Sequence, residues 1–197
     1  MYAVRAVNAR LRSKRPVFWQ LIAFLAVAGA FVTSAHAQLP ALHLQASRES
    51  PNESVCLVTL QDGVRVYVNA PSNANADHPR ELIVFAVPNG NTLEETLGAV
   101  SPDAEMWRYD IQHVLAQVRL YRDRCTESAV MLAVVEAPKL SWPTYRQSTP
   151  DANHRIGAIV DALTDQLQAD RVILSGHSGG GSFLFGYIDS RGTIDPV

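Results

Sequence analysis

Cysteine, metal-binding motifs and nucleotide-binding motifs are rare or missing in this sequence. Only two of its 197 residues are cysteine, Cys56 and Cys125, and neither has a partner at a zinc-like spacing. The chain contains no G-x-G-x-x-G motif and no lysine-bearing phosphate loop. We therefore predict that the protein has no structural metal and no cofactor.

Basic residues are scarce outside the first part of the chain. Residues 1–37 contain five of the 17 Lys and Arg residues and none of the 19 Asp and Glu residues, so the remainder carries a net charge of −7. No basic stripe remains there to bind nucleic acid. A nucleic-acid partner is therefore not expected.

The first 37 residues have the pattern of an export signal. A basic segment is followed by the apolar run "VFWQLIAFLAVAGAFV" (17–32) and by Ala35 and Ala37 in A-x-A spacing. We predict cleavage after Ala37 and a periplasmic or secreted protein that meets the membrane only during export. The alternative is an uncleaved membrane anchor formed by residues 17–37, although the apolar run is short for a full span.

Export would place the two cysteines in an oxidising compartment, where a disulfide can persist. The sequence does not show whether Cys56 and Cys125 meet. A disulfide between them and two separate buried thiols both remain open.

The rest of the chain alternates between strand and helix patterns. Residues 38–53 are polar and irregular and are expected to form a flexible lead-in, and "QDG" (61–63) favours a β-hairpin. We expect hairpin strands at 54–60 and 64–71, further strands at 81–87, 129–138 and 171–176, helices at 92–100, 103–124, 152–170 and from 181 to 188, and a loop at 140–150. Thr92 and Glu95 have capping-box spacing at the first helix. This order predicts one α/β domain over 54–197, with a mostly parallel sheet covered by helices on both faces.

The segment "GHSGG" (176–180) is the clearest chemical motif. It fits G-x-S-x-G and lies directly between a strand pattern and a helix pattern. In that setting a sharp turn raises the serine hydroxyl above the sheet, and small neighbours leave room for adjoining segments. We predict that Ser178 is a nucleophile and that Gly176, His177 and Gly180 support its turn.

On this motif and the order of elements over 54–190, the chain resembles the α/β-hydrolase superfamily, in particular exported hydrolase-like proteins of unassigned substrate. The resemblance implies attack by Ser178 on an ester, amide or related acyl bond of a small-molecule or peptide substrate. It also implies an oxyanion hole formed by the N–H of Gly179 and by a donor from the loop "PNGNT" (88–92), either Asn89 or Gly90. The alternative is a non-catalytic binding or structural protein of the same fold.

The sequence does not supply an obvious base for Ser178. All six histidines precede it, whereas the resembled fold places an acid and then a histidine after the serine. We expect that the chain is a C-terminally truncated fragment, inactive as it stands, whose acid, base and last strands lie beyond Val197. The alternative is that His154 or His113 has been recruited.

Several other polar residues are candidates of lower rank. Trp142, Tyr145 and Arg146 are expected either to line a substrate cleft or to be solvated in a loop. Glu136, at the end of a predicted strand, is interpreted as a strand-end charge.

Overall fold

The computed structural model describes residues 39–98 and 113–192. The predicted export signal lies outside these ranges, as do residues 103–112 of the predicted long helix.

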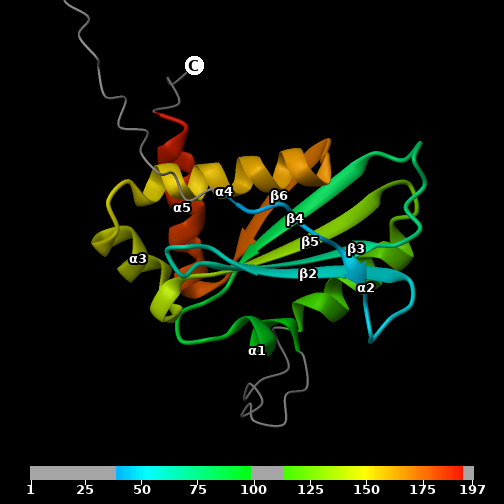
Figure 1. The fold of residues 1–197 in the computed structure, drawn as a ribbon, viewed down its shortest axis with the longest axis horizontal. Helices are drawn as coiled ribbons and strands as arrows, with labels where there is room; N and C mark the ends of the chain where they lie inside the picture. The colour runs from blue at the N-terminus through cyan, green and yellow to red at the C-terminus, as the bar shows by residue number, and fades with distance from the viewer. Residues whose placement is uncertain (1–38, 99–112, 193–197) are drawn as a thin grey trace, which may run out of the picture. The chain divides into compact units, whose positions relative to one another are not determined.

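The described chain forms one six-stranded sheet in the order β1-β2-β3-β5-β4-β6 (Figure 1). The strands are β1 (Gln45–Ala46), β2 (Glu53–Thr59), β3 (Arg65–Pro71), β4 (Arg80–Ala86), β5 (Ala129–Glu136) and β6 (Arg171–Gly176). The predicted hairpin is confirmed, since β2 and β3 pair antiparallel from Glu53↔Pro71 to Thr59↔Arg65.

The expectation of a mostly parallel sheet is wrong, because the sheet is mixed. Only β4 with β5 and β4 with β6 pair parallel, whereas β1 with β2, β2 with β3 and β3 with β5 pair antiparallel. The hairpin joins the sheet through β3, which runs opposite to β5. The parallel region is therefore limited to β5, β4 and β6.

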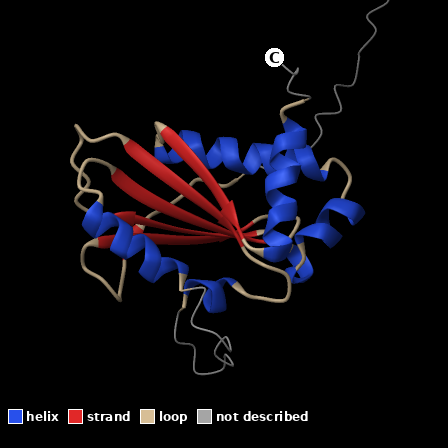
Figure 2. Cartoon of the chain, turned by 180° about the vertical axis from the view of Figure 1, so that it is seen from behind, coloured by secondary structure: helices blue, strands red, loops and turns tan. Residues whose placement is uncertain are grey.

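Helices cover both faces of the sheet, as predicted (Figure 2). They are α1 (Leu93–Leu97), α2 (Val114–Arg124), α3 (Trp142–Ser148), α4 (Ala152–Leu167) and α5 (Gly181–Ser190), with single turns η1 (Pro138–Leu140) and η2 (Ser178–Gly180). The sheet has one hydrophobic core on each face, and successive residues of β5 point alternately into the two cores. Met131, Ala133 and Val135 pack with α3, α4 and α5, and Val130, Leu132 and Val134 pack with α1 and α2. The strand is buried along its whole length, which explains its continuous apolar sequence.

The predicted loop at 140–150 is instead largely helical. Ser141 caps α3 by accepting a hydrogen bond from the Thr144 N–H, and a proline occupies the first turn, as is common at helix starts. Trp142 and Tyr145 are buried, with exposed fractions of 0% and 3%. Neither residue is solvated in a loop, because both anchor α3 in the core.

The described part of the segment before β2 is mostly exposed, but it contacts the rest of the domain at three places. Leu39 is buried in the core beside α4. The N–H of Leu42 donates to Gln166 Oε1 at 2.8 Å. Gln45 and Ala46 then add the short strand β1 to the edge of β2.

Both cysteines are free thiols in the structure, so the disulfide considered above is not formed. Cys56 lies on β2 and Cys125 ends α2. Within the described ranges, no helix has the length and hydrophobicity needed to span a membrane.

Candidate functional site

Ser178 occupies a sharp turn between β6 and α5. Its φ angle is +51°, in the left-handed region that non-glycine residues seldom adopt. His177 before it is extended, and the Gly180 N–H donates back to the His177 carbonyl at 2.9 Å. The chain thus passes from strand to helix through one strained residue, and Ser178 is exposed there.

Close backbone contacts explain two glycines after the serine. A β-carbon added at Gly179 would lie 2.0 Å from Asn89 Oδ1, and one added at Gly180 would lie 2.3 Å from the Ala86 carbonyl oxygen. A larger residue at Gly180 would push the turn away from the end of β4, whereas one at Gly179 would displace the Asn89 side chain. At Gly176, a β-carbon would approach the Gly180 backbone to 3.0 Å, so its place in the turn also favours a small residue.

The sheet order brings the predicted oxyanion loop to this turn. β6 pairs directly with β4 and Ala86 lies opposite Gly176, so the segments that follow these strands leave the sheet side by side. Residues 88–92 follow β4, and the Asn89 side chain lies against Gly179. The structure therefore places together the two segments that were predicted to share a site.

The two loop candidates, Asn89 and Gly90, differ in their hydrogen bonding. The Gly90 N–H donates to the Leu140 carbonyl at 2.9 Å, whereas no hydrogen bond from the Asn89 N–H or the Gly179 N–H occurs among the described residues. The geometry thus favours Asn89 over Gly90 as the second donor.

Aromatic packing holds α5, the helix that follows the Ser178 turn. Phe183 of α5 is fully buried and its ring centroid lies 4.7 Å from that of Trp142. The Arg146 side chain, which was considered for a cleft, instead donates to Asp189 at 2.6 Å and to Asn153 at 2.8 Å. These contacts tie α5 to α3 and α4.

No base contacts Ser178 within the described part of the chain, where its hydroxyl makes no hydrogen bond. His154 and His177 are exposed, on α4 and in the turn itself. His113 precedes α2, on the sheet face opposite α4 and α5. These contacts therefore do not support the recruitment of an upstream histidine as the base for Ser178.

Glu136 is the polar residue that the sequence interpretation undervalued. It ends β5 with an exposed fraction of only 5%. Its Oε2 accepts the Leu93 N–H at 2.6 Å, and its two oxygens lie 3.1 and 3.2 Å from Arg65 Nη1. Arg65 also pairs with Glu94, and that hydrogen bond raises the pKa of the Arg65 guanidinium. The sequence does contain an indication of this role, because Glu136 follows seven apolar residues. Such a position predicts a buried charge at the carboxyl end of a strand.

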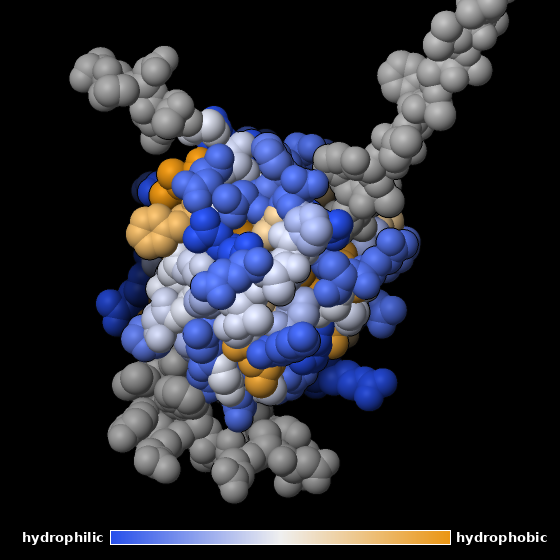
Figure 3. Space-filling view, turned by 90° about the vertical axis from the view of Figure 1, so that its left-hand side faces the viewer, coloured by the Kyte–Doolittle hydropathy of each residue, from blue (hydrophilic) through white to orange (hydrophobic). Residues whose placement is uncertain are grey.

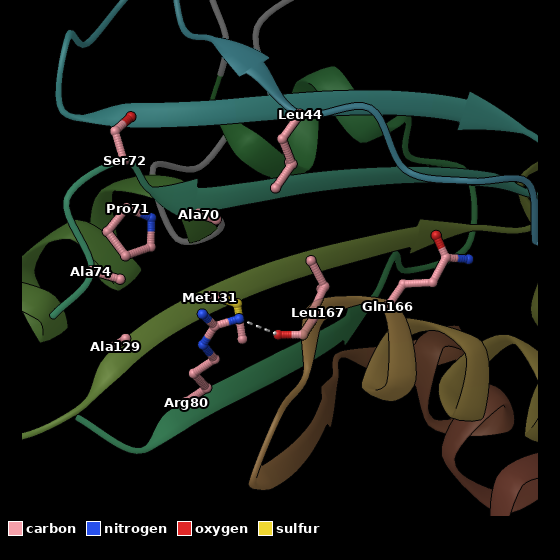
Figure 4. Close-up of a pocket in the computed structure, with 10 residues that line it drawn as sticks. All are labelled: Leu44, Ala70, Pro71, Ser72, Ala74, Arg80, Ala129, Met131, Gln166 and Leu167. Carbon is pink, nitrogen blue, oxygen red and sulfur yellow. Dashed lines mark hydrogen bonds between the residues drawn. The ribbon is translucent and has the colours of Figure 1, made fainter. Parts of the chain in front are cut away.

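A cavity of about 270 Å³ lies at the other end of the sheet (Figure 4). Arg80 and Ala129, which line it, begin β4 and β5, whereas Ser178 follows the end of β6. A seven-residue strand spans roughly 20 Å, so this cavity does not adjoin the serine. Arg80 Nη1 in it already donates to the Leu167 carbonyl at 3.3 Å.

The end of the molecule that bears α3 has a mostly polar surface, with hydrophobic side chains in small groups (Figure 3). Among the described residues, no group of three or more His, Cys, Asp or Glu side chains could hold a metal ion.

No family model matches this chain, and no curated protein does. The site must therefore be interpreted from its own geometry.

Proposed function

We propose that this chain carries the nucleophile and oxyanion hole of a serine hydrolase of α/β-hydrolase type. The observation that carries the proposal is the strained Ser178, at φ +51° immediately after a parallel strand, with Asn89 packed on Gly179. Backbone strain of this kind persists only where the surrounding structure enforces it, and strained residues are concentrated at active sites.

The chemistry would be attack by the Ser178 oxygen on an acyl carbon of an ester, amide or related bond. The carbonyl oxygen gains negative charge as the carbon becomes tetrahedral. The N–H groups of Gly179 and Asn89 are the donors available to stabilise that charge, and one such donor contributes about 3 kcal/mol. The adjacent N-terminus of α5 adds a favourable dipole.

The missing base favours a second candidate, a non-catalytic protein with the same fold. A serine hydroxyl is a weak nucleophile until a neighbouring group accepts its proton. The described residues provide no such contact to Ser178. The strained turn would then be retained for binding or for structure.

An alkyl fluorophosphonate, used at alkaline pH where hydroxide can accept the proton, separates the two candidates. The hydrolase proposal predicts stoichiometric modification of Ser178, located by peptide mass spectrometry, and none in Ser178→Ala. Ser182, in the first turn of α5, is the matched control, because Ser182→Ala should leave labelling unchanged. A folded protein that stays unmodified at Ser178 favours the binding protein.

Export remains part of the proposal, on the pattern of residues 1–37. N-terminal sequencing of protein produced in a bacterial host should begin at Gln38. An intact Met1 would instead favour the membrane anchor.

A further inference from the structure

The predicted oxyanion loop (88–92) and the residues on either side of it are attached at three points to the end of β5 and to the segment that follows it. The Val87 N–H donates to the Val135 carbonyl at 2.9 Å, and the Gly90 N–H donates to the Leu140 carbonyl at 2.9 Å. The third attachment is the bond from the Leu93 N–H to Glu136 Oε2 at 2.6 Å. β4 lies between β5 and β6, so this loop has the serine turn on one side and Glu136 on the other.

The Glu136 carboxylate is itself fixed in place. Its side chain is 7% exposed and pairs with Arg65 Nη1 through both oxygens. A buried charge needs such compensation. Arg65 also binds Glu94 on α1. The start of α1 is therefore connected to the sheet twice, through its backbone at Leu93 and through its side chain at Glu94.

The second attachment depends on strained backbone. Lys139 and Leu140 have φ angles of +56° and +53°, a conformation unfavourable for residues with a β-carbon. This turn presents the Leu140 carbonyl to the Gly90 N–H. The strained segment lies at the same edge of the sheet, on the side of the loop opposite the serine turn, which indicates that the position of the loop matters.

We infer that Glu136 is a positioning residue for the oxyanion loop, an inference that rests on the proposed function. Its carboxylate accepts the Leu93 N–H and thereby fixes the end of the loop 88–92. The position of that end determines where Asn89 lies. Donors in such a site must be held within about 0.5 Å of the productive geometry. Loss of one donor lowers the rate about 10²–10³-fold, so misplacement of Asn89 should cost part of that factor.

The test compares three variants in the fluorophosphonate reaction at Ser178. Glu136→Asp keeps a negative charge beside Arg65, but its side chain is shorter by one methylene. The carboxylate therefore moves away from the Leu93 N–H. Glu136→Gln keeps the length and removes the charge. Glu94→Gln is the matched control, because it removes the other carboxylate from Arg65 without touching the backbone of the loop.

The inference predicts that Glu136→Asp lowers the limiting inactivation rate constant about tenfold or more, with little change in the concentration of half-saturation. It also predicts faster amide hydrogen exchange at Leu93 in that variant. Glu94→Gln should stay within about twofold of the parent. If Glu136→Gln does not fold, Glu136→Asp and its exchange rates still decide the question.

Two failures can be told apart. If the parent is labelled at Ser178 and Glu136→Asp reacts equally fast, the positioning role is wrong while the proposed function stands. The same holds if Glu94→Gln is slowed as much as Glu136→Asp. If the folded parent is not labelled at all, the proposed function fails and the positioning role fails with it.

Discussion

Ser178 adopts a backbone conformation that most serines avoid, and its neighbours show why the turn is so tight. Gly180 lies against the Ala86 carbonyl and Gly179 lies against Asn89. The turn therefore approaches the end of β4 more closely than a side chain would allow. At the residue scale, the site is defined by two glycines, Gly179 and Gly180, which have no β-carbon, and by the strained φ angle of Ser178.

Replacing Gly180 tests this close approach. Gly180→Ala would place a β-carbon 2.3 Å from the Ala86 carbonyl oxygen, which belongs to the backbone of β4. We therefore expect the turn to shift, a loss of stability of about 1–3 kcal/mol, and at least tenfold slower labelling of Ser178. Chemical denaturation and fluorophosphonate kinetics measure the two effects.

Gly181→Ala is the control for that variant. A β-carbon there meets nothing within 4 Å, and alanine suits a helix better than glycine. Its stability should be unchanged or slightly higher, with labelling at the parental rate. Equal behaviour of the two variants would show that the contact between Gly180 and the Ala86 carbonyl does not constrain the turn.

At the scale of elements, the short helix α1 decides how the oxyanion loop ends. Its capping box is complete: the Thr92 hydroxyl accepts the Glu95 N–H, and Glu95 accepts the Thr92 N–H. Gly98 ends the helix in a left-handed conformation with φ +78°. Five residues form only a marginal helix alone, so the caps and the bond to Glu136 hold it.

Removing the cap should loosen this element. Thr92→Ala leaves the Glu95 N–H without its acceptor, and such substitutions cost about 1 kcal/mol. We expect faster amide exchange at Glu95 and a lower free energy of unfolding, whereas Thr92→Ser, which keeps the hydroxyl, should retain most of both. Parental stability in Thr92→Ala would mean that tertiary contacts alone hold α1.

At the scale of the whole molecule, a charged cluster joins the hairpin to α2. Glu53 on β2 binds Arg119 through two hydrogen bonds of 2.6 and 2.9 Å, and also accepts bonds from Arg122 and Asn69. The bond from Arg119 holds the pKa of Glu53 below its usual value of 4.5. This cluster connects residues far apart in the chain and fixes one helix layer to the sheet.

The lowered pKa predicts how stability depends on pH. A carboxyl with a lower pKa in the folded state contributes stability above its unfolded value of 4.5 and loses it as pH falls through the folded pKa. Unfolding should therefore become easier below about pH 4.5. In Glu53→Gln, the part of this acid destabilisation that is due to Glu53 should disappear. The free energy of unfolding at neutral pH should fall by about 2 kcal/mol. This loss is smaller than for a fully buried ion pair because Arg119 is partly exposed.

Glu49→Gln is the control for the pH experiment. Glu49 lies 3.7 Å from the same Arg119 and its side chain is 66% exposed, so its removal should leave the acid transition nearly unchanged. Urea titrations across the acid range measure all three proteins. An unaltered pH profile in Glu53→Gln would show that other carboxyl groups control the transition.

The sequence by itself determined most of the local structure. The turn at 61–63, the alternating apolar segments and the capping box at Thr92 each depend on neighbouring residues, so the hairpin, the helix α4 and the start of α1 could be predicted. The motif around Ser178 could be recognised for the same reason, because it is identified by its own residues together with the strand pattern before it and the helix pattern after it.

Only the tertiary structure decided how the sheet is ordered and what meets at its carboxyl edge. The placement of β4 between β5 and β6 is a long-range outcome of packing, and no local pattern specifies it. That order brings Asn89 to Gly179 and Glu136 to Leu93, and it places Trp142 in the core. Contacts between residues more than 40 positions apart depend on the whole chain, and the candidate site consists of such contacts.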